Sequence, residues 1–357
     1  MTIKHFSIEY DAINSKNTFT NGDTINGRII VEVSKQTRIQ SLVLIATGKA
    51  RVCWQEQYGD NHHVYWADEK YYSVQHHILR EARQDGTEVI AKGRHIFPFS
   101  FKIPDRKLPS SFKSSVGKIV HKFRAELKRS LKLTKKAKAH FTFVSKADMD
   151  IPGLMDPQYG CKDKAIKLFG SGTISMDVYT KKMGYEQGEA LQIILKISNH
   201  STRSVKPKFI LYEKRSFFAQ GHRKLWTNEI LKQKTEAVAP STSETVTKVI
   251  TIPRDLPPSI LNCAIIKMEY RLKIRLNVKC ASDPKIKLPI VILPEARPVT
   301  QTPPSASFGF QTVGNSNQST WSATPQQTAS QPLGPPPSYE ENALYPPLPE
   351  SSKQTAF

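Results

Sequence analysis

The chain has 357 residues, of which 38% are hydrophobic and 9% aromatic, so it is long enough for two folded domains with cores of their own. Its formal net charge of +21 favours anionic partners such as phospholipid headgroups, phosphorylated peptides or nucleic acid. The first ten residues lack the apolar core of a signal peptide, and no apolar run approaches the ~18 residues that cross a bilayer.

Short runs rich in β-branched and aromatic residues follow one another along the first half of the chain. They are FSIEY, TINGRIIVEV, IQSLVLIA, YYSVQHHIL and HIFPFSFKI. Several alternate apolar with polar residues, which is typical of half-buried strands, and turn-forming residues separate them. Residues 113–128 fit an amphipathic helix or a strand equally well.

The same character returns after Pro152, in SGTISMDVY, ALQIILKIS, KFILYEKRSFF, TVTKVITI, EYRLKIRLNV and LPIVIL. A segment that starts at Phe19 matches one that starts at Tyr185 at a constant offset. The aligned pairs include Gly22 with Gly188, Asp23 with Glu189, Ile25 with Leu191, Ile29 with Leu195, Val31 with Ile197 and Ile39 with Val205. The Ile-Pro pairs at 103–104 and 252–253 follow in the same order. The repeat predicts an all-β fold of two tandem immunoglobulin-type β-sandwiches, at residues 1–150 and 163–295.

The remaining residues, 296–357, form a tail rich in Pro, Ser, Thr and Gln. Such a segment buries too little apolar surface to offset its ordering entropy, so we expect it to be disordered. It contains the PPxY motif Pro336-Pro337-Ser338-Tyr339. Consecutive prolines favour polyproline II, and the motif fits a WW domain, with an aromatic groove for the prolines and a pocket for Tyr339.

Repeat, strand order and tail motif together resemble the arrestin domain-containing proteins, or α-arrestins. The resemblance covers about residues 1–295 and the tail motif. It implies two arrestin-like domains in a non-catalytic trafficking adaptor that links membrane receptors or transporters to WW-domain HECT-type ubiquitin ligases. It also implies cargo ubiquitination, endocytic or endosomal sorting, and a cytoplasmic location at the periphery of the plasma membrane and endosomes.

A second proline cluster departs from the family pattern, in which two PPxY motifs are common. It consists of Tyr345, Pro346, Pro347, Leu348 and Pro349. Its final proline leaves the tyrosine pocket of a WW domain empty. The cluster can suit another WW class or a tyrosine sorting signal, and a proline-rich spacer is the simpler interpretation.

Residues 112–140 hold ten Lys or Arg and one acid, Glu126. On a strand, Lys122, Arg124 and Lys128 share one face while Arg129 points to the other. Lys132, Lys135, Lys136 and Lys138 are expected to crowd the next turn. These eight residues are the predicted contact for phosphorylated cargo or acidic phospholipids.

Other chemistries have weaker support. Nucleic-acid binding is the alternative use of the charge, but no zinc spacing, helix-turn-helix or RNP-like strand appears. No catalytic motif is present, so we expect neither an enzyme nor a cofactor. His62, His63, His76, His77 and His95 are expected in exposed loops without a metal. Cys53, Cys161, Cys263 and Cys280 lack CxxC spacing and are expected as small, buried, unpaired thiols in a reducing compartment.

Overall fold

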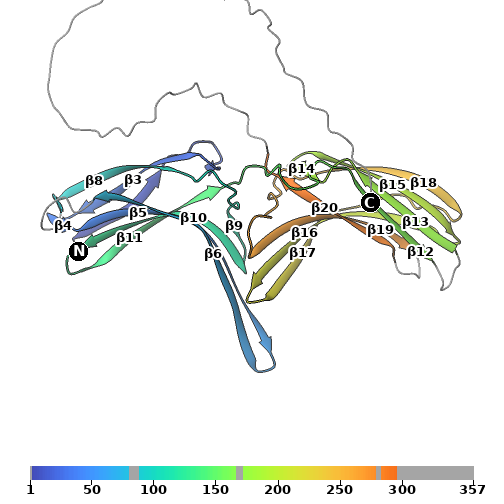
Figure 1. Ribbon diagram of the computed structural model, residues 1–357, viewed down its shortest axis with the longest axis horizontal. Helices are drawn as coiled ribbons and strands as arrows, with labels where there is room; N and C mark the ends of the chain where they lie inside the picture. The colour runs from blue at the N-terminus through green and yellow to red at the C-terminus, as the bar shows by residue number, and fades with distance from the viewer. Residues whose placement is uncertain (1, 80–87, 166–171, 279–282, 296–357) are drawn as a thin grey trace, which may run out of the picture. The chain divides into compact units, whose positions relative to one another are not determined.

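The computed structural model describes residues 2–79, 88–165, 172–278 and 283–295, and the described residues contain no helix. The regular secondary structure of the described residues consists of strands only (Figure 1). The prediction of an all-β chain is therefore confirmed.

The strands before residue 150, here called the N-lobe, form two main sheets and a short ribbon. One sheet has the order β1-β3-β8, and the other has the order β2-β11-β10-β5-β6 with β9 beside β10. The bounds are β1 (Ile3–Tyr10), β2 (Thr18–Phe19), β3 (Thr24–Val33), β5 (Ser41–Tyr58), β6 (Asn61–Leu79), β8 (Gly93–Lys102), β9 (Phe112–Lys113), β10 (Gly117–Arg129) and β11 (Lys132–Phe143). The ribbon pairs β4 (Thr37–Ile39) with β7 (Glu88–Ile90).

The strands from Gln158 onward, here called the C-lobe, repeat this arrangement. Their sheets have the orders β12-β13-β15-β18 and β14-β20-β19-β16-β17. The bounds are β12 (Gln158–Ala165), β13 (Gly172–Thr180), β14 (Gly184–Glu186), β15 (Ala190–Ser201), β16 (Val205–Ala219), β17 (His222–Lys234), β18 (Thr242–Thr251), β19 (Ile266–Val278) and β20 (Lys285–Leu293). β12 begins before residue 163, the predicted start of the second domain.

The sequence repeat corresponds to equivalent positions in the two lobes. Gly22 and Gly188 both adopt a positive φ, of 80° and 87°, which favours glycine. The amide of Ile103 donates to the carbonyl of Asp23, and the amide of Ile252 donates to the carbonyl of Glu189, both at 2.9 Å. β2 pairs in parallel with β11, as β14 does with β20. The two tandem sandwiches predicted from the repeat are thus present.

The cores follow from strand alternation. In β19 every second residue from Ile266 to Val278 is buried, and β10 follows the same rule through Leu127. One core cluster lies within the N-lobe, and a larger one joins the C-lobe to a few residues of β5, β6, β10 and the turn before β10. These residues are Ala50, Val52, Trp54, Tyr65, Val116 and Ile119.

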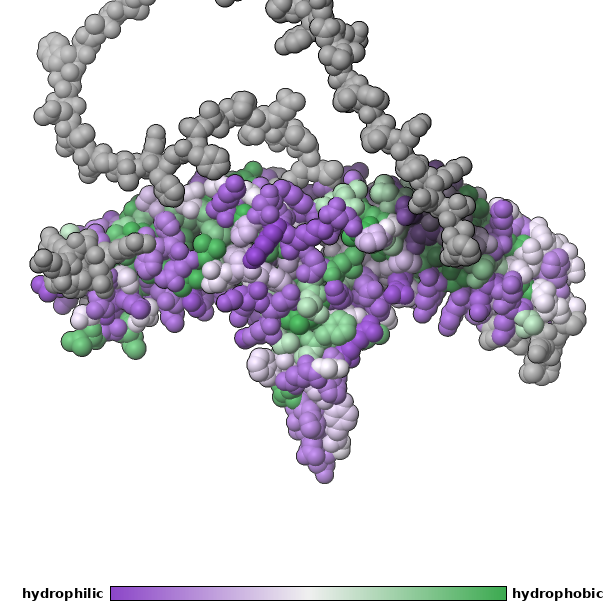
Figure 2. Space-filling model, viewed as in Figure 1, coloured by the Kyte–Doolittle hydropathy of each residue, from purple (hydrophilic) through white to green (hydrophobic). Residues whose placement is uncertain are grey.

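The hairpin of β5 and β6 extends from the N-lobe as a long arm (Figure 1). One face of the arm packs Trp54 and Tyr65 together, and the Tyr65 ring lies 4.3 Å from the His222 ring of the C-lobe. The opposite face exposes Val64 and Trp66. Toward its tip the arm is largely hydrophilic (Figure 2).

Candidate functional site

A basic face covers the exposed side of the sheet formed by β11, β10 and β5. Along β10, Phe123, Ala125 and Leu127 enter the core, so the residues between them point away from it. The positions of Lys122, Arg124 and Lys128 on one face agree with the period of two that the sequence shows. We call this surface the N-lobe basic face.

Strand register decides which of the remaining predicted residues join this face. Lys136 lies opposite Glu126 and Lys138 opposite Arg124, so both belong to it. Lys135 lies opposite the buried Leu127 and therefore points to the core side at the edge of the sheet. Arg129 and Lys132 face each other at the end of the hairpin, beyond a register shift.

The expectation that four lysines crowd a turn is wrong. The turn consists of residues 130 and 131 only, where Leu131 adopts a positive φ of 51°. Lys132, Lys135, Lys136 and Lys138 lie on β11, and alternation separates them onto different sides of the sheet. The block of charge is therefore divided between two faces.

Three cationic or titratable residues of the face were not among the predicted contacts. Lys49 of β5 lies opposite Val120 of β10. Lys118 lies two residues before Val120 and therefore on the same face of β10. His140 of β11 lies opposite Lys122. The period of two could have identified Lys118, which belongs to the same strand. The others join through pairing with β5 and β11, which the sequence alone does not specify.

Like charges are crowded on the N-lobe basic face. Burial, and then the charges of Lys138, Lys49, Arg124 and Lys118, lower the pKa of Lys122. Burial and the lysines around it also lower the pKa of His140. Glu126 is the only acid of this segment, and its carboxylate lies 3.1 Å from Arg124 Nε and 3.7 Å from Lys136 Nζ. An anion bound here would relieve the remaining repulsion.

Two features beneath the face could accommodate or position such an anion. A cavity of about 470 Å³ is bordered by Lys113, Lys118 and His140. Thr47, the cross-strand neighbour of Lys122, has a buried hydroxyl with no hydrogen-bond partner among the described residues. Both favour a polar ligand at this end of the sheet.

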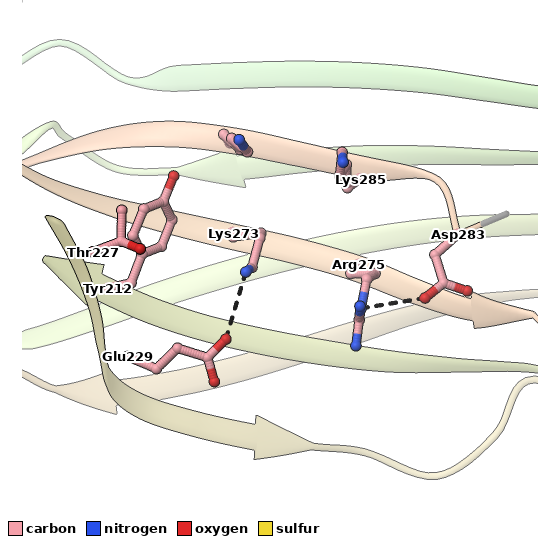
Figure 3. Close-up of a pocket in the computed structure, with 8 residues that line it drawn as sticks. Tyr212, Thr227, Glu229, Lys273, Arg275, Asp283 and Lys285 are labelled. Atoms are coloured by element: carbon pink, nitrogen blue, oxygen red, sulfur yellow. Dashed lines mark ion pairs between the residues drawn. The ribbon is translucent and has the colours of Figure 1, made fainter. Parts of the chain in front are cut away.

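A second basic face, which the sequence did not predict, lies on the C-lobe. Arg271, Lys273 and Arg275 alternate along β19, and Lys285 and Lys287 lie beside them on β20. Lys273, Arg275, Lys285 and Lys287 border a cavity of about 520 Å³, where Lys273 pairs with Glu229 at 3.6 Å and Arg275 with Asp283 at 3.3 Å (Figure 3). The alternating cations of RLKIR and KIK were the sequence signal for it. We call this surface the C-lobe basic face.

On the C-lobe basic face, too, cations outnumber acids. Among the described residues, Lys208, Lys234, Lys285 and Lys287 form no ion pair. Burial, followed by the charges of Arg275, Lys234 and Lys232, lowers the pKa of Lys208.

The other predicted sites have mixed outcomes. The two tail motifs, Pro336 to Tyr339 and Tyr345 to Pro349, lie outside the described residues, as does Cys280. Cys263 is buried, but Cys53 and Cys161 are exposed, so the prediction of buried thiols is wrong for these two. They lie on the arm and on the edge strand β12, where no second layer covers the side chain.

The histidines are on strands instead of loops. His62, His63, His76 and His77 are exposed on β6, and His95 is half-buried on β8. Across the described ranges, no group of three or more His, Cys, Asp or Glu side chains could hold a metal ion. The described part of the chain also contains no helix long and apolar enough to span a bilayer.

Comparison with known proteins agrees with the fold. Residues 6–150 match the family model for the N-terminal domain of arrestin (or S-antigen), and residues 170–296 match that for its C-terminal domain. Arrestin domain-containing protein 4 of Mus musculus is 28% identical over 287 residues, which are 78% of this chain and 69% of the mouse protein. Thioredoxin-interacting protein of Mus musculus is 26% identical over 297 residues, which are 81% of this chain and 73% of that protein. The chain therefore belongs to the arrestin domain-containing, or α-arrestin, family.

Proposed function

We propose that this protein is a non-catalytic adaptor that links membrane cargo to a WW-domain HECT-type ubiquitin ligase. The family relation supports an adaptor role in general. The PPxY motif Pro336 to Tyr339, in a Pro-rich segment after two arrestin domains, is the observation that carries the link to a ligase. The adaptor would work on the cytoplasmic side of the plasma membrane and endosomes, and lead to cargo ubiquitination and sorting.

In this mechanism the chain itself performs no chemistry. The folded lobes hold the cargo and the tail holds the ligase, so the effective concentration of the ligase at cargo lysines rises. With a single complete PPxY motif, the tail lacks the avidity that two motifs would offer to a ligase with several WW domains. Tyr345 to Pro349 would contribute less, because a proline stands where the motif needs tyrosine.

The ligase link is tested by titrating a purified WW domain against the full chain. The variant Tyr339→Ala should lose at least about tenfold in affinity, because the tyrosine ring fills its own pocket. The control Tyr345→Ala should stay within about twofold of the wild type, and both variants should keep the same thermal unfolding. Unchanged capture by Tyr339→Ala would show that this tail motif does not bind the ligase.

For the cargo side, we propose that the N-lobe basic face binds phosphorylated cargo or acidic phospholipid headgroups. Five of its cations, Lys49, Lys118, Lys122, Lys128 and Lys138, form no ion pair within the described ranges. Phosphate groups would satisfy these donors and reduce the repulsion among them.

The test compares Arg124→Glu/Lys138→Glu with Lys4→Glu/Lys92→Glu, which makes the same charge change at exposed positions off this face. Phosphopeptides and anionic vesicles serve as separate probes, so that the two sources of phosphate are distinguished. Only the first variant should weaken binding by about tenfold or more, with a steep dependence on salt. Equal losses in both variants would mean that net charge alone, and not this face, attracts the anion.

A further inference from the structure

The hairpin of β10 and β11 ends in two leucines that the fold does not cover. Leu131, in the turn, is 99% exposed, and Leu133, near the start of β11, is 91% exposed. Every other exposed large hydrophobic side chain in the described ranges is at most 66% exposed. Figure 2 shows hydrophobic side chains that project from the N-lobe at the lower left, where this hairpin ends in Figure 1. Exposed apolar residues are common singly, but this pair forms an apolar tip.

The backbone of the hairpin gains nothing from leucine at these positions. Leu131 adopts a positive φ of 51°, a conformation that glycine and asparagine adopt with less strain. Leu133 falls within the register shift between the pairs Leu127–Lys135 and Arg129–Lys132, where regular pairing is interrupted. Neither leucine belongs to a core cluster. Their contribution therefore lies outside the fold.

Cations surround the two leucines, and acids are absent. The hairpin end, residues 128–136, contains five Lys or Arg and no Asp or Glu. Of the five, only Lys136 forms an ion pair among the described residues. Lys136 belongs to the N-lobe basic face, Lys135 points to the opposite side, and Arg129 and Lys132 face each other beside the turn. Positive charge thus flanks the apolar tip on both sides of the sheet.

We propose that the hairpin end inserts Leu131 and Leu133 into the interface of an anionic phospholipid bilayer. Lys132 lies between the leucines, and Lys135 lies two residues beyond Leu133, about 7 Å along the strand. Apolar groups at a membrane interface are buried by about 5–10 Å, so these amines would lie at the depth of the phosphate groups. The long stems of lysine and arginine allow their charges to remain there.

The division of charge between two faces favours a bilayer over a phosphorylated peptide. Lys135 and Lys136 point to opposite sides of the sheet, so a peptide that lies on one face cannot contact both. A layer of headgroups surrounds a hairpin that enters by its end, and it contacts both. Phosphate alone also offers the leucines no apolar contact. The inference therefore goes beyond the phosphate contact proposed for the N-lobe basic face, and does not depend on it.

The experiment measures sedimentation of the full chain with vesicles of phosphatidylcholine, with and without phosphatidylserine. Leu131→Asn/Leu133→Ser should weaken binding to the phosphatidylserine vesicles by at least about tenfold. The matched control Ile13→Asn/Val249→Ser removes side chains that are 48% and 51% exposed elsewhere, and should change binding by less than about twofold. Equal binding by the leucine variant and the wild type would overturn the proposal and leave the leucines to a protein partner. Absence of wild-type binding would overturn it as well.

Thermal unfolding separates a membrane contact from a structural role. Asparagine tolerates the φ of Leu131 better than leucine does, so Leu131→Asn alone should keep or raise the melting temperature while it weakens vesicle binding. A lower melting temperature together with weaker binding would show that the leucine supports the fold, and would contradict the proposal.

A soluble phosphopeptide distinguishes this proposal from the phosphate contact of the N-lobe basic face. The leucine variant should bind the phosphopeptide as the wild type does. Loss of both ligands would mean that the leucines maintain the basic face, and insertion would be wrong. If the wild type binds vesicles but no phosphopeptide, the proposed contact with phosphorylated cargo is wrong and insertion stands.

Charge variants test the part assigned to the cations. Arg129→Glu/Lys132→Glu should weaken vesicle binding by at least about tenfold, since each cation near an anionic surface contributes to binding. Lys181→Glu/Lys196→Glu makes the same charge change at exposed positions of the C-lobe and should have a much smaller effect. Equal losses in the two variants would show that net charge alone attracts the vesicles, and would contradict the site.

The depth of insertion is measured directly with a tryptophan at the tip. Leu131→Trp should show more quenching by phospholipids with brominated acyl chains than the wild type, whose own tryptophans provide the background. Ile13→Trp, at a partly exposed position off the hairpin, should show no such increase. No additional quenching in Leu131→Trp would place the tip above the acyl chains and refute insertion.

Discussion

Replacing His121 by glutamine should remove a pH dependence of N-lobe stability. His121 is 1% exposed, and its ring contacts Phe141 and Phe143. Nε2 lies 3.0 Å from the carbonyl oxygen of Pro109, and Nδ1 lies 3.1 Å from the Tyr72 hydroxyl. A neutral ring satisfies both contacts when Nε2 donates and Nδ1 accepts from Tyr72. A protonated ring would place a donor against that hydroxyl and a charge in the core.

Burial accordingly lowers the pKa of His121 from 6.5 to about 4. The unfolded chain takes up a proton below about pH 6.5, whereas the folded chain does so only near pH 4. The stabilisation is therefore complete above pH 6.5 and is lost as the pH falls toward 4. Linkage gives a loss of about 2 kcal/mol between about pH 7.5 and pH 5.

Urea unfolding of the wild type and of His121→Gln over this pH range measures the effect. The variant is expected to be less stable than the wild type at pH 7.5, because glutamine packs poorly among the aromatic rings. Between pH 7.5 and pH 5, however, its free energy of unfolding should fall by about 2 kcal/mol less than that of the wild type. The difference between the two curves removes the contribution of carboxylates, which titrate at lower pH in both proteins. Parallel curves would refute the argument that His121 is buried as the neutral form.

Three further predictions concern packing, a buried ion pair and the contact between the lobes. Gly48→Ala should lower N-lobe stability by about 1–3 kcal/mol in urea unfolding, because its Cβ would lie 2.3 Å from the Tyr72 ring; Gly59→Ala, with open space around it, should cost about 1 kcal/mol from its positive φ. Glu213→Gln should cost about 2–3 kcal/mol, since Arg215 loses a carboxylate that is almost fully buried, and a melting temperature equal to the wild type would argue against it. Glu69→Ala should speed the labelling of buried Cys263 by a thiol reagent, because Glu69 accepts from the Ala264 amide at 2.8 Å and holds the arm against the C-lobe. Mass spectrometry of the Cys263 peptide measures the labelling rate, and an unchanged rate would show that this contact does not limit access.

The sequence predicted those strands whose two faces differ. Ile25, Ile29 and Val31 lie at alternate positions on the buried side of β3, and polar residues such as Asn26, Arg28 and Glu32 occupy most of the other side. Their counterparts in β15 follow the same pattern, and the repeat then identified the second lobe. The distal parts of β5 and β6 and the strand β17 were missed for the same reason. Residues such as Gln55 to Tyr58 and Leu225 to Glu229 have solvent on both sides, so their strand character rests on backbone pairing and leaves no alternation in hydropathy.

The sequence predicted which residues of a single strand belong to the N-lobe basic face, but not which residues of the neighbouring strands join them. Lys122, Arg124 and Lys128 share β10, where the period of two suffices. Whether Lys138 or Lys135 joins them depends on the register of β11, which a two-residue turn and a register shift near Arg129 determine. A shift of one residue would exchange the faces of all β11 side chains, so the run of lysines alone could not specify the site.

Both basic faces carry more cations than the fold pairs with acids. On β10 and β19 the core is built by the alternate residues, such as Phe123 and Leu272, and the cations lie between them. Some of these cations pair with acids, but Lys122 and Lys128 of β10, and Lys285 and Lys287 of β20, form no ion pair among the described residues and add repulsion. Burial first, and the like charges around them second, lower the pKa values of Lys122 and Lys208, because both disfavour the protonated amines. A surface that stabilised the fold would intersperse acids, as Glu126 and Glu269 do for Arg124 and Arg271. Cations that burden the folded state and lack a partner within it are better explained by anions that arrive from outside.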